Sequence, residues 1–225
     1  MYAHRYRRVG MMKNVVIACQ TIKDELNLAI KETQCRYPVV WIDSSYHLHP
    51  DKLRLKLQEE VDNLRNIDNI LLAYGFCGNA IVGLKASGAN LIFPRTDDCI
   101  SMVLGCSEGN KMKAAYFLTR GWIESPGGIM VDYSNAVKRY GEEKTERIFR
   151  LMLKHYNKLV VIDTGAYNLV DYIQKVQKFA RISNLDLVVA EGSIGLLKKL
   201  LTGPYDDKFC IIKKEQEVNI DDILF

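Results

Sequence analysis

The chain has 225 residues, 48% of them hydrophobic and 26% charged, which suits a globular protein with a substantial core. Its formal net charge is +4, and part of that excess comes from the first residues, at Arg5, Arg7, Arg8 and Lys13. The rest is close to neutral, which argues against a nucleic-acid partner. No run reaches the roughly 18 apolar residues of a membrane-spanning helix, so we expect no membrane partner and a cytoplasmic protein.

The first residues and the spacing of the cysteines indicate how the chain is organised. Residues 1–12 are polar and basic, and we predict a disordered extension there, because no apolar segment of a targeting signal follows. We predict an N-terminal α/β lobe over 13–125 and a C-terminal α/β lobe over 126–225. The six cysteines are widely spaced, which is not typical of a secreted disulfide framework. Three of them are interpreted as small core residues: Cys35, Cys106 and Cys210.

The first half of the chain alternates strand-like and helix-like segments. Continuous apolar runs, typical of strands buried on both faces, predict strands at 15–19, 39–43, 70–74 and 91–94. Apolar residues at helical spacing and turn residues predict helices at 24–32, 50–64, 80–86 and 97–104. Four βα units in succession predict a parallel sheet with helices on both faces.

The second half begins irregularly and then returns to the same alternation. We predict in order a helix at 107–115, a strand at 116–119, a Gly/Pro-rich loop at 120–128 and a helix at 142–155. Strands then follow at 159–163, 185–190 and 209–213, with helices at 169–180 and up to Leu201. The order predicts an α/β fold with a Rossmann-like parallel sheet, either as one sheet of seven or eight strands or as two Rossmann-like lobes.

Three cysteines and a histidine follow four predicted strands at their carboxyl ends. Cys19 closes the first strand, His47 comes shortly after the second, and Cys77 and Cys99 follow the next two. Because the carboxyl ends of parallel strands open onto one crevice, we expect these side chains to converge. Thiolates and imidazole suit zinc, and an iron–sulfur cluster is the alternative. The sequence therefore predicts a metal centre held by these four residues or a subset.

Cys77 lies in the segment Gly75-Phe76-Cys77-Gly78-Asn79, at a predicted strand-to-helix turn. Glycines there let the backbone bend and a ligand approach, so Gly75, Gly78 and Asn79 are candidates for cofactor binding. The simpler alternative is a glycine turn that carries a packed thiol. The turn after the first strand, Cys19-Gln20-Thr21-Ile22-Lys23, contains no glycine, which counts against a dinucleotide cofactor such as NAD.

Polar residues precede Cys99 after the fourth strand. Arg95 suits an anionic group of a substrate, and Asp98 suits a hydrogen bond that holds a ligand in place. We therefore assign Arg95 and Asp98 as catalytic candidates. Thr96 or Asp97 is expected to cap the following helix.

These same segments resemble a family known only as domain of unknown function 1638. The motifs that carry the resemblance span most of residues 13–200: Ala18-Cys19 with Glu25, Asp43 to Leu53 with His47 and Pro50, Tyr74-Gly75-Phe76-Cys77-Gly78-Asn79, Val82-Gly83-Leu84, Pro94 to Ile100, Leu104-Gly105 and Gly121-Trp122-Ile123-Glu124. The resemblance matches five candidates to motif positions: Cys19, His47, Cys77, Arg95 and Cys99. This chain has Thr96-Asp97 where a His-Asp pair is expected, which argues against an imidazole there.

The resemblance implies relatives in anaerobes and methanogens, some encoded near corrinoid-dependent methyltransferases, and it implies no established activity. Together with the residues, it predicts a metal-dependent enzyme of anaerobic one-carbon or sulfur metabolism, such as a zinc-dependent methyltransferase. The metal would activate a thiol or another small substrate, and a corrinoid protein is the partner that the resemblance implies. The loop that carries Trp122 would cover the site. Two alternatives stay open: a carrier of an iron–sulfur cluster, metal or corrinoid, and a metal-free small-molecule binding protein.

Overall fold

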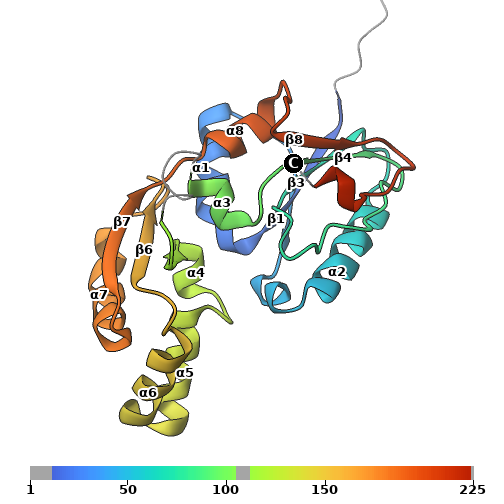
Figure 1. Ribbon diagram of the computed structural model, residues 1–225. Coiled ribbons are helices and arrows are strands. Elements are labelled where there is room, and N and C mark those ends of the chain that lie inside the picture. Colours follow the sequence, from blue (N-terminus) through green and yellow to red (C-terminus); the bar gives the residue numbers. More distant parts are fainter. Residues whose placement is uncertain (1–11, 105–111, 224–225) are drawn as a thin grey trace, which may run out of the picture.

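Two sheets form the centres of two lobes in the computed structural model, which describes residues 12–104 and 112–223 (Figure 1). The first sheet has the strand order β2-β1-β3-β4-β8, with strands β1 (Asn14–Cys19), β2 (Val39–Ile42), β3 (Asn69–Ala73), β4 (Asn90–Pro94) and β8 (Phe209–Ile212). The second has the order β5-β6-β7, with strands β5 (Ala115–Leu118), β6 (Lys158–Asp163) and β7 (Asp186–Glu191). The α/β class and the parallel sheets with helices are confirmed.

The first sheet is covered on both faces. The helices α1 (Lys23–Thr33) and α8 (Gly195–Thr202) pack together on one face, and α2 (Pro50–Asn63) lies on the other (Figure 1). The apolar runs of β1 and β3 are fully buried from Val16 to Cys19 and from Ile70 to Ala73, as a sheet with two covered faces requires. Pro50 occupies the first turn of α2, where its missing N–H costs no hydrogen bond.

The strand order of the first sheet fixes where a ligand site belongs. β1 pairs in parallel with β2 on one side and with β3 on the other, and β4 follows β3 in parallel. The chain therefore builds the sheet outward in one direction from β1 and then in the opposite direction. Ligands of open α/β sheets bind at the carboxyl ends of the strands where this direction reverses, which here lies between β1 and β3.

The second lobe has its own core. Its helices are α4 (Arg120–Glu124), α5 (Ile129–Tyr140), α6 (Glu142–Met152) and α7 (Val170–Ser183). Three aromatic rings meet edge to face in this core: those of Tyr133, Phe149 and Phe179, with ring centroids 5.2 to 6.1 Å apart. Trp122 packs against both this core and that of the first lobe, so α4 joins the two.

The two sheets divide the chain differently from the expected ranges 13–125 and 126–225. β5 and α4, which precede residue 126, belong to the second lobe, and α8 and β8 return to the first. β8 pairs antiparallel with β4, so that Phe93 lies opposite Cys210. The first lobe is therefore built from two separate stretches of the chain, and the second lobe lies between them in sequence.

Three expected elements differ in the structure. Residues 80–86 form no helix: residues 80–83 are turns and Lys85 bridges to Glu217, because the chain enters them from left-handed backbone and passes Gly83 at φ +87°. Within 120–128, the predicted loop contains the helix α4, and the following helix α5 was not predicted. Of the helix predicted at 107–115, residues 107–111 lie outside the described part, and Ala115 begins β5.

Close backbone contact joins the lobes at the start of α4. A Cβ built on Gly121 would lie 1.9 Å from the carbonyl oxygen of Thr21, so only glycine permits this approach. The buried Thr119 hydroxyl lies 3.5 Å from the same oxygen, and Arg120 forms an ion pair of 3.2 Å with Asp24. The lobes therefore contact each other through the segment that follows Cys19.

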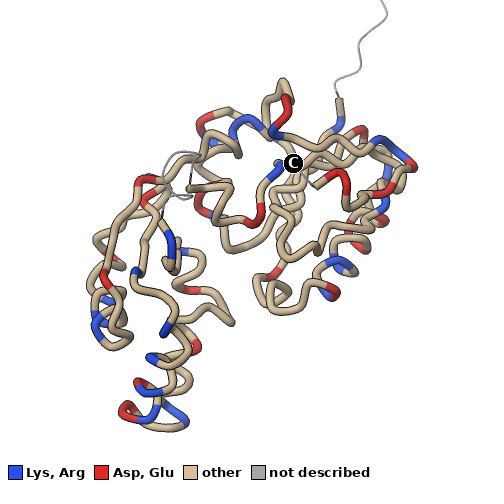
Figure 2. Tube along the Cα trace, in the orientation of Figure 1, with Lys and Arg blue, Asp and Glu red and all other residues tan. Residues whose placement is uncertain are grey.

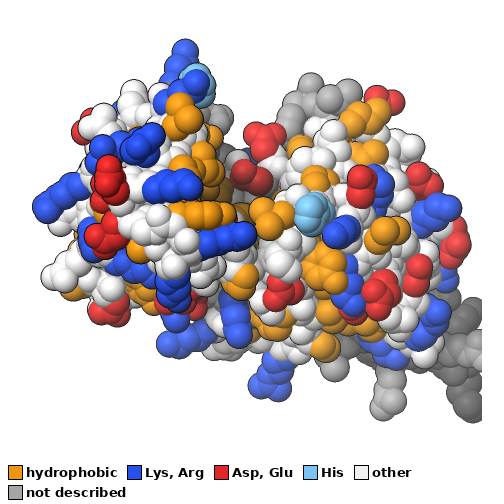
Figure 3. Space-filling model, turned by 90° about the horizontal axis from the view of Figure 1, so that it is seen from below, with side chains coloured by type: hydrophobic (Ala, Val, Ile, Leu, Met, Phe, Trp, Pro, Cys, Tyr) orange, Lys and Arg blue, Asp and Glu red, His pale blue; other side chains and the backbone are white. Residues whose placement is uncertain are grey.

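The surface is consistent with this two-lobed arrangement. Seen from below, it is hollowed between the lobes, and apolar side chains gather around the junction (Figure 3). Basic and acidic residues are interspersed along the outer helices, as at the α5–α6 end of the second lobe (Figure 2). Over the described residues, no helix has both the length and the apolar character to cross a bilayer.

Candidate functional site

The site begins with a contact between Cys19 and His47. Cys19 ends β1, and its sulfur accepts the Thr21 N–H at 3.4 Å, which caps the 3-10 turn η1 (Gln20–Ile22). His47 lies on a second 3-10 turn, η2 (Ser44–Leu48), whose start is capped by the Asp43 carboxylate. The two turns bring the Cys19 Sγ within 2.8 Å of the His47 Nε2. A thiol and an imidazole that are distant in sequence therefore meet at the carboxyl ends of β1 and β2.

Thr21 connects this pair to Cys99. Its hydroxyl lies 3.0 Å from the Cys19 sulfur and 3.5 Å from the Cys99 sulfur, so the two sulfurs are no farther apart than these contacts together. Cys19 and Cys99 are fully buried. Cys99 begins the helix α3 (Cys99–Leu104), and the cap of this helix is Asp98, whose Oδ1 accepts the Ser101 N–H at 2.7 Å. The expectation that Thr96 or Asp97 provides this cap was wrong.

Cys77 is presented by an unusual turn. Cys77, Gly78 and Asn79 all have left-handed backbone, with φ values of +46°, +66° and +65°. This conformation costs a non-glycine residue roughly 1–2 kcal/mol, and such strain is concentrated at functional sites. The Cys77 N–H donates to the Asp97 carbonyl at 2.8 Å and so fixes the turn against the segment before Cys99.

Gly75 makes this contact between the two segments possible. A Cβ at Gly75 would lie 2.6 Å from the Asp98 Cα and 2.7 Å from the Thr96 carbonyl oxygen. The role of Gly75 is therefore close backbone packing that holds the Cys77 turn beside Cys99. Gly78 and Asn79 shape the same turn and lie at its exposed side.

Burial and mutual repulsion keep the three thiols neutral. Burial raises the pKa of the Cys19 thiol, against the lowering effect of its hydrogen bonds with Thr21. Burial, with the charges of Cys19 and Asp98, raises the pKa of Cys77 to about 12, although the backbone N–H groups of Gly75 and Cys99 lower it. Burial also raises the pKa of Cys99 well above its ordinary value, and the other two cysteines raise it further. Each thiolate thus disfavours the others, and a cation among them would reverse this effect.

Aromatic residues enclose the group. The Trp122 ring, which α4 brings from the second lobe, lies 5.1 Å from the His47 ring between centroids. Burial lowers the pKa of His47, which favours the neutral imidazole that binds metals, while the Asp98 charge opposes this shift. Tyr74 lies beside the thiols at the end of β3. Burial raises the pKa of its phenol well above the usual range, and the charges of the three cysteines raise it further. Among the described residues, the buried Trp122 Nε1 has no hydrogen-bond partner.

The arrangement supplies soft donors at the point where the strand order reverses. Sulfur and imidazole nitrogen favour zinc over magnesium or calcium. Within residues 12–104 and 112–223, no three or more His, Cys, Asp or Glu side chains are grouped as a formed metal site. The described cysteines are all free of disulfides. The contacts therefore link Cys19, His47 and, through Thr21, Cys99 as reduced side chains.

A cavity lies beside this group, where the lobes meet. It has a volume of about 350 Å³ and is lined by Gln20 and Ser44 from the first lobe and by Arg120, Gly121 and Glu124 from the second. Gln20 directly follows Cys19, and Ser44 begins the turn that carries His47. A small molecule in this cavity would therefore lie next to the turns that hold the Cys19–His47 pair.

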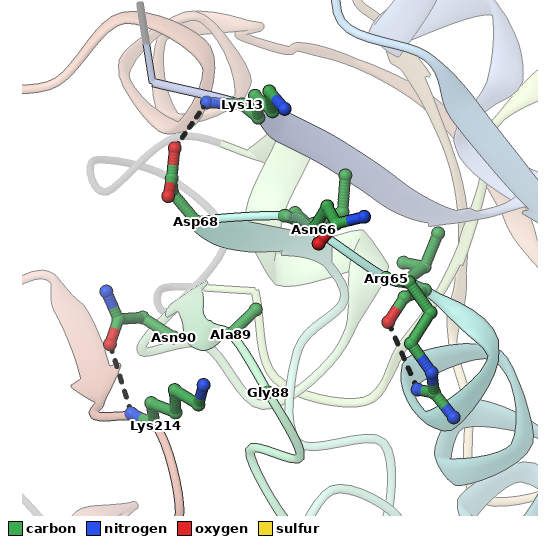
Figure 4. A pocket seen from close by; sticks show the side chains of 10 residues that line it. Lys13, Arg65, Asn66, Asp68, Gly88, Ala89, Asn90 and Lys214 are labelled. Atoms are coloured by element: carbon green, nitrogen blue, oxygen red, sulfur yellow. Dashed lines mark hydrogen bonds between the residues drawn. The ribbon is translucent and has the colours of Figure 1, made fainter. Parts of the chain in front are cut away.

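Another cavity, of about 850 Å³, lies at the opposite edge of the first sheet (Figure 4). Its polar side chains already hold the strand starts together: Asp68 accepts the Lys13 N–H at 2.7 Å, and the Asn90 Oδ1 accepts the Lys214 N–H at 3.0 Å. A ladder of side-chain amides from Asn14 through Asn69 to Asn90 continues the same edge. The polar side chains around this cavity therefore serve to hold the edge of the sheet together.

Sequence reasoning anticipated some of this group and missed other members. Arg95 lies apart from the thiols: its guanidinium donates to the Asp222 carbonyl, and it lines a different cavity. Thr21 and Tyr74 were not identified, although Thr21 lies two residues after Cys19 and Tyr74 directly follows β3. Cys210 is buried as expected, Cys35 is half-buried, and Cys106 lies outside the described residues.

Comparison with known proteins places the chain in a family. A family model described as "Protein of unknown function (DUF1638)" matches residues 41–201, which is well over half of the chain. Searches of the curated proteins and of the solved structures found no match. The matched range includes His47, Cys77 and Cys99. The chain therefore belongs to the DUF1638 family.

Proposed function

We propose that the protein is a zinc-dependent enzyme that activates a thiol or another small substrate. Zinc would be held by Cys19, His47 and Cys99, with Cys77 as a further ligand. The observation that carries this proposal is the 2.8 Å contact between the Cys19 Sγ and the His47 Nε2, with Cys99 joined to it through Thr21. When bound, zinc lowers the pKa of a thiol or water that it coordinates and so supplies a nucleophile at neutral pH.

The residues around the donors have separate tasks. Thr21 orients the sulfurs of Cys19 and Cys99 through its hydroxyl, as an outer partner of metal ligands does. Trp122 covers His47 and limits water at the ligand. The cavity of about 350 Å³ beside η1 is the place proposed for the small substrate.

The wider setting of the reaction belongs to the same proposal. Free thiols in the described residues support a reducing compartment such as the cytoplasm. Methyl transfer from a corrinoid protein, in anaerobic one-carbon or sulfur metabolism, is supported by the family resemblance alone. An iron–sulfur cluster on the same cysteines is the alternative cofactor, and it would make the protein a carrier.

Metal analysis tests the proposal. We expect protein purified anaerobically to contain stoichiometric zinc, and the variants Cys19→Ala, His47→Ala and Cys99→Ala to lose it. Thr21→Val keeps every ligand but removes the outer hydroxyl, so we expect its zinc affinity to fall by about 10- to 100-fold.

Cys35→Ala is the matched control, because Cys35 is also a free, partly buried cysteine but accepts only a hydrogen bond from the Tyr37 N–H among the contacts described. Its zinc content should equal that of the wild type. Iron with visible colour in place of zinc would favour the cluster carrier. Wild-type protein with neither metal would contradict the proposal.

A further inference from the structure

The segment that leads from β4 to α3 also lines a second cavity, of about 340 Å³. Arg95 and Thr96 contribute to it from the end of β4, and Met102 contributes from α3. Leu196 and Lys199 line it from α8, and Lys208 lines it from the segment before β8. Its volume falls within the range of pockets for small ligands, roughly 300–1,000 Å³.

The charged groups of this cavity are positive. Its described lining residues include Arg95, Lys199 and Lys208 and no carboxylate. Lys199 is paired with Asp206 at 2.5 Å, so its charge is largely balanced. Arg95 and Lys208 remain, and the hydrogen bond of 2.7 Å from the Arg95 N–H to the Lys208 carbonyl keeps their backbones side by side. These two unbalanced cations suit a ligand that carries about two negative charges.

Arg95 is held in place by the fold. Its guanidinium donates to the Asp222 carbonyl, which leaves further N–H groups for a ligand, because a guanidinium has five. An arginine fixed in this way loses less side-chain entropy when it binds an anion.

The first turn of α8 adds to the positive potential. This eight-residue helix has Ile194 as its N-cap residue, which provides no side-chain cap among the described contacts. The Ser193 hydroxyl accepts the Gly195 N–H at 3.0 Å, and both residues line the cavity. The positive end of the helix dipole therefore lies at the wall that Gly195 and Leu196 form.

The rest of the lining is apolar or lacks a partner. Met102 is buried and Leu196 is half-buried, so the cavity offers apolar contact as well as charge. The Thr96 hydroxyl is buried and has no hydrogen-bond partner among the described residues. A ligand atom that forms a hydrogen bond with this hydroxyl would remove the cost of leaving it unpaired.

We propose that this cavity binds a phosphate monoester of a small, apolar alcohol. The phosphate dianion matches the unbalanced charges of Arg95 and Lys208 and the start of α8, and the organic part contacts Met102 and Leu196. A carboxylate carries one charge and would leave one cation unmatched. This inference is independent of the zinc proposal, because it involves none of the thiols.

Isothermal titration calorimetry with phenyl phosphate tests it. We expect saturable binding that is at least about tenfold tighter than that of inorganic phosphate, which lacks the ring, and of phenyl sulfate, which has one charge fewer. Lys208→Gln should weaken the binding of phenyl phosphate by about tenfold or more, because a hydrogen bond to a charged group is lost. Arg95→Gln should do the same, and the exposed Lys208 gives a second variant in case loss of the Asp222 contact impairs folding.

Lys198→Gln is the matched control, because Lys198 is next to Lys199 on α8 but pairs with Glu32 at 3.0 Å and does not line the cavity. Binding by this variant should equal that of the wild type. Absence of saturable binding, or an equal loss in Lys198→Gln, would overturn the inference. Zinc measured in the same samples separates the proposals: binding without zinc removes only the zinc proposal, and zinc without binding removes only this one.

Discussion

The Thr164 hydroxyl donates a hydrogen bond of 3.2 Å to the Oε1 of Glu25, and this contact joins the end of β6 to the first turn of α1. Glu25 is 1% exposed, and its Oε2 has no hydrogen-bond partner among the described residues. Burial raises the pKa of Glu25 to about 7, although its own backbone N–H, Thr164 and Arg120 lower it. The lobes thus meet at a carboxyl group that is neutral in mildly acidic solution.

This carboxyl should make stability depend on pH. Because the pKa of Glu25 is about 7 in the folded protein and 4.5 when unperturbed, the native state binds more protons between these values, and stability falls as pH rises through them. Glu25→Gln keeps the shape without the charge, so we expect it to exceed the wild type by up to about 3 kcal/mol near pH 8 and to equal it near pH 4. Urea unfolding at both pH values measures this difference. The exposed Glu32→Gln is the control, and an unchanged pH dependence in Glu25→Gln would refute the assignment.

Gly121→Ala should weaken the contact between the lobes. The added Cβ would lie 1.9 Å from the Thr21 carbonyl oxygen and 2.6 Å from its carbon, and neither backbone atom can move away easily. We expect a loss of about 3 kcal/mol or more in the free energy of unfolding. Gly195→Ala is the control, because its Cβ would meet the Ser193 hydroxyl at 3.2 Å and that side chain can rotate. A Gly121→Ala protein as stable as Gly195→Ala would show that the lobes do not pack in this way.

The strain at Cys77 predicts an unusual order of stabilities. Cys77→Gly and Cys77→Ala both remove the thiol, but only glycine adopts φ +46° without cost. We expect the glycine variant to unfold at a higher urea concentration, by about 1 kcal/mol in stability. At Cys35, which has no positive φ, the order should be the reverse, because glycine loses more chain entropy on folding. A Cys77→Ala protein more stable than Cys77→Gly would contradict the left-handed turn.

Trp122 should report on the zinc that we propose at His47. The chain has two tryptophans, so the Trp41→Phe variant leaves Trp122 as its only indole. Because its ring lies 5.1 Å from His47, we expect a chelator that removes zinc to change the emission of Trp41→Phe protein. The Trp122→Phe protein should show no change, since Trp41 lies over Lys23 instead. An equal change of emission in both variants would show that Trp122 does not lie next to the metal.

The strands could be predicted from the sequence more reliably than the connections. Runs such as Ile70-Leu71-Leu72 are apolar at every position, which strands buried on both faces require. The helices α4 and α5 were missed because Gly121 and Gly128 indicate a loop. In the structure each has a tertiary reason instead: Gly121 admits the Thr21 carbonyl, and a Cβ on Gly128 would meet the Trp122 carbonyl at 2.3 Å. A single sequence does not distinguish these two uses of glycine.

The candidate site shows the same division. The approach of Cys19 and His47 follows from the parallel order of β1 and β2, which the alternating elements predict. The direction of the Arg95 side chain could not be predicted in this way. It depends on a hydrogen bond to the Asp222 carbonyl, which the chain reaches only after the second lobe. Asp98 was assigned to the chemistry, whereas its carboxylate caps α3.

The return of β8 to the first sheet has a consequence during synthesis on the ribosome. β4 gains its outer neighbour only when Phe209–Ile212 emerges, after the whole second lobe has been made. Until then the nascent chain exposes an unpaired, apolar strand edge, which is a template for association with other chains. Truncations that end before residue 209 should therefore be aggregation-prone, because they leave the first sheet without β8.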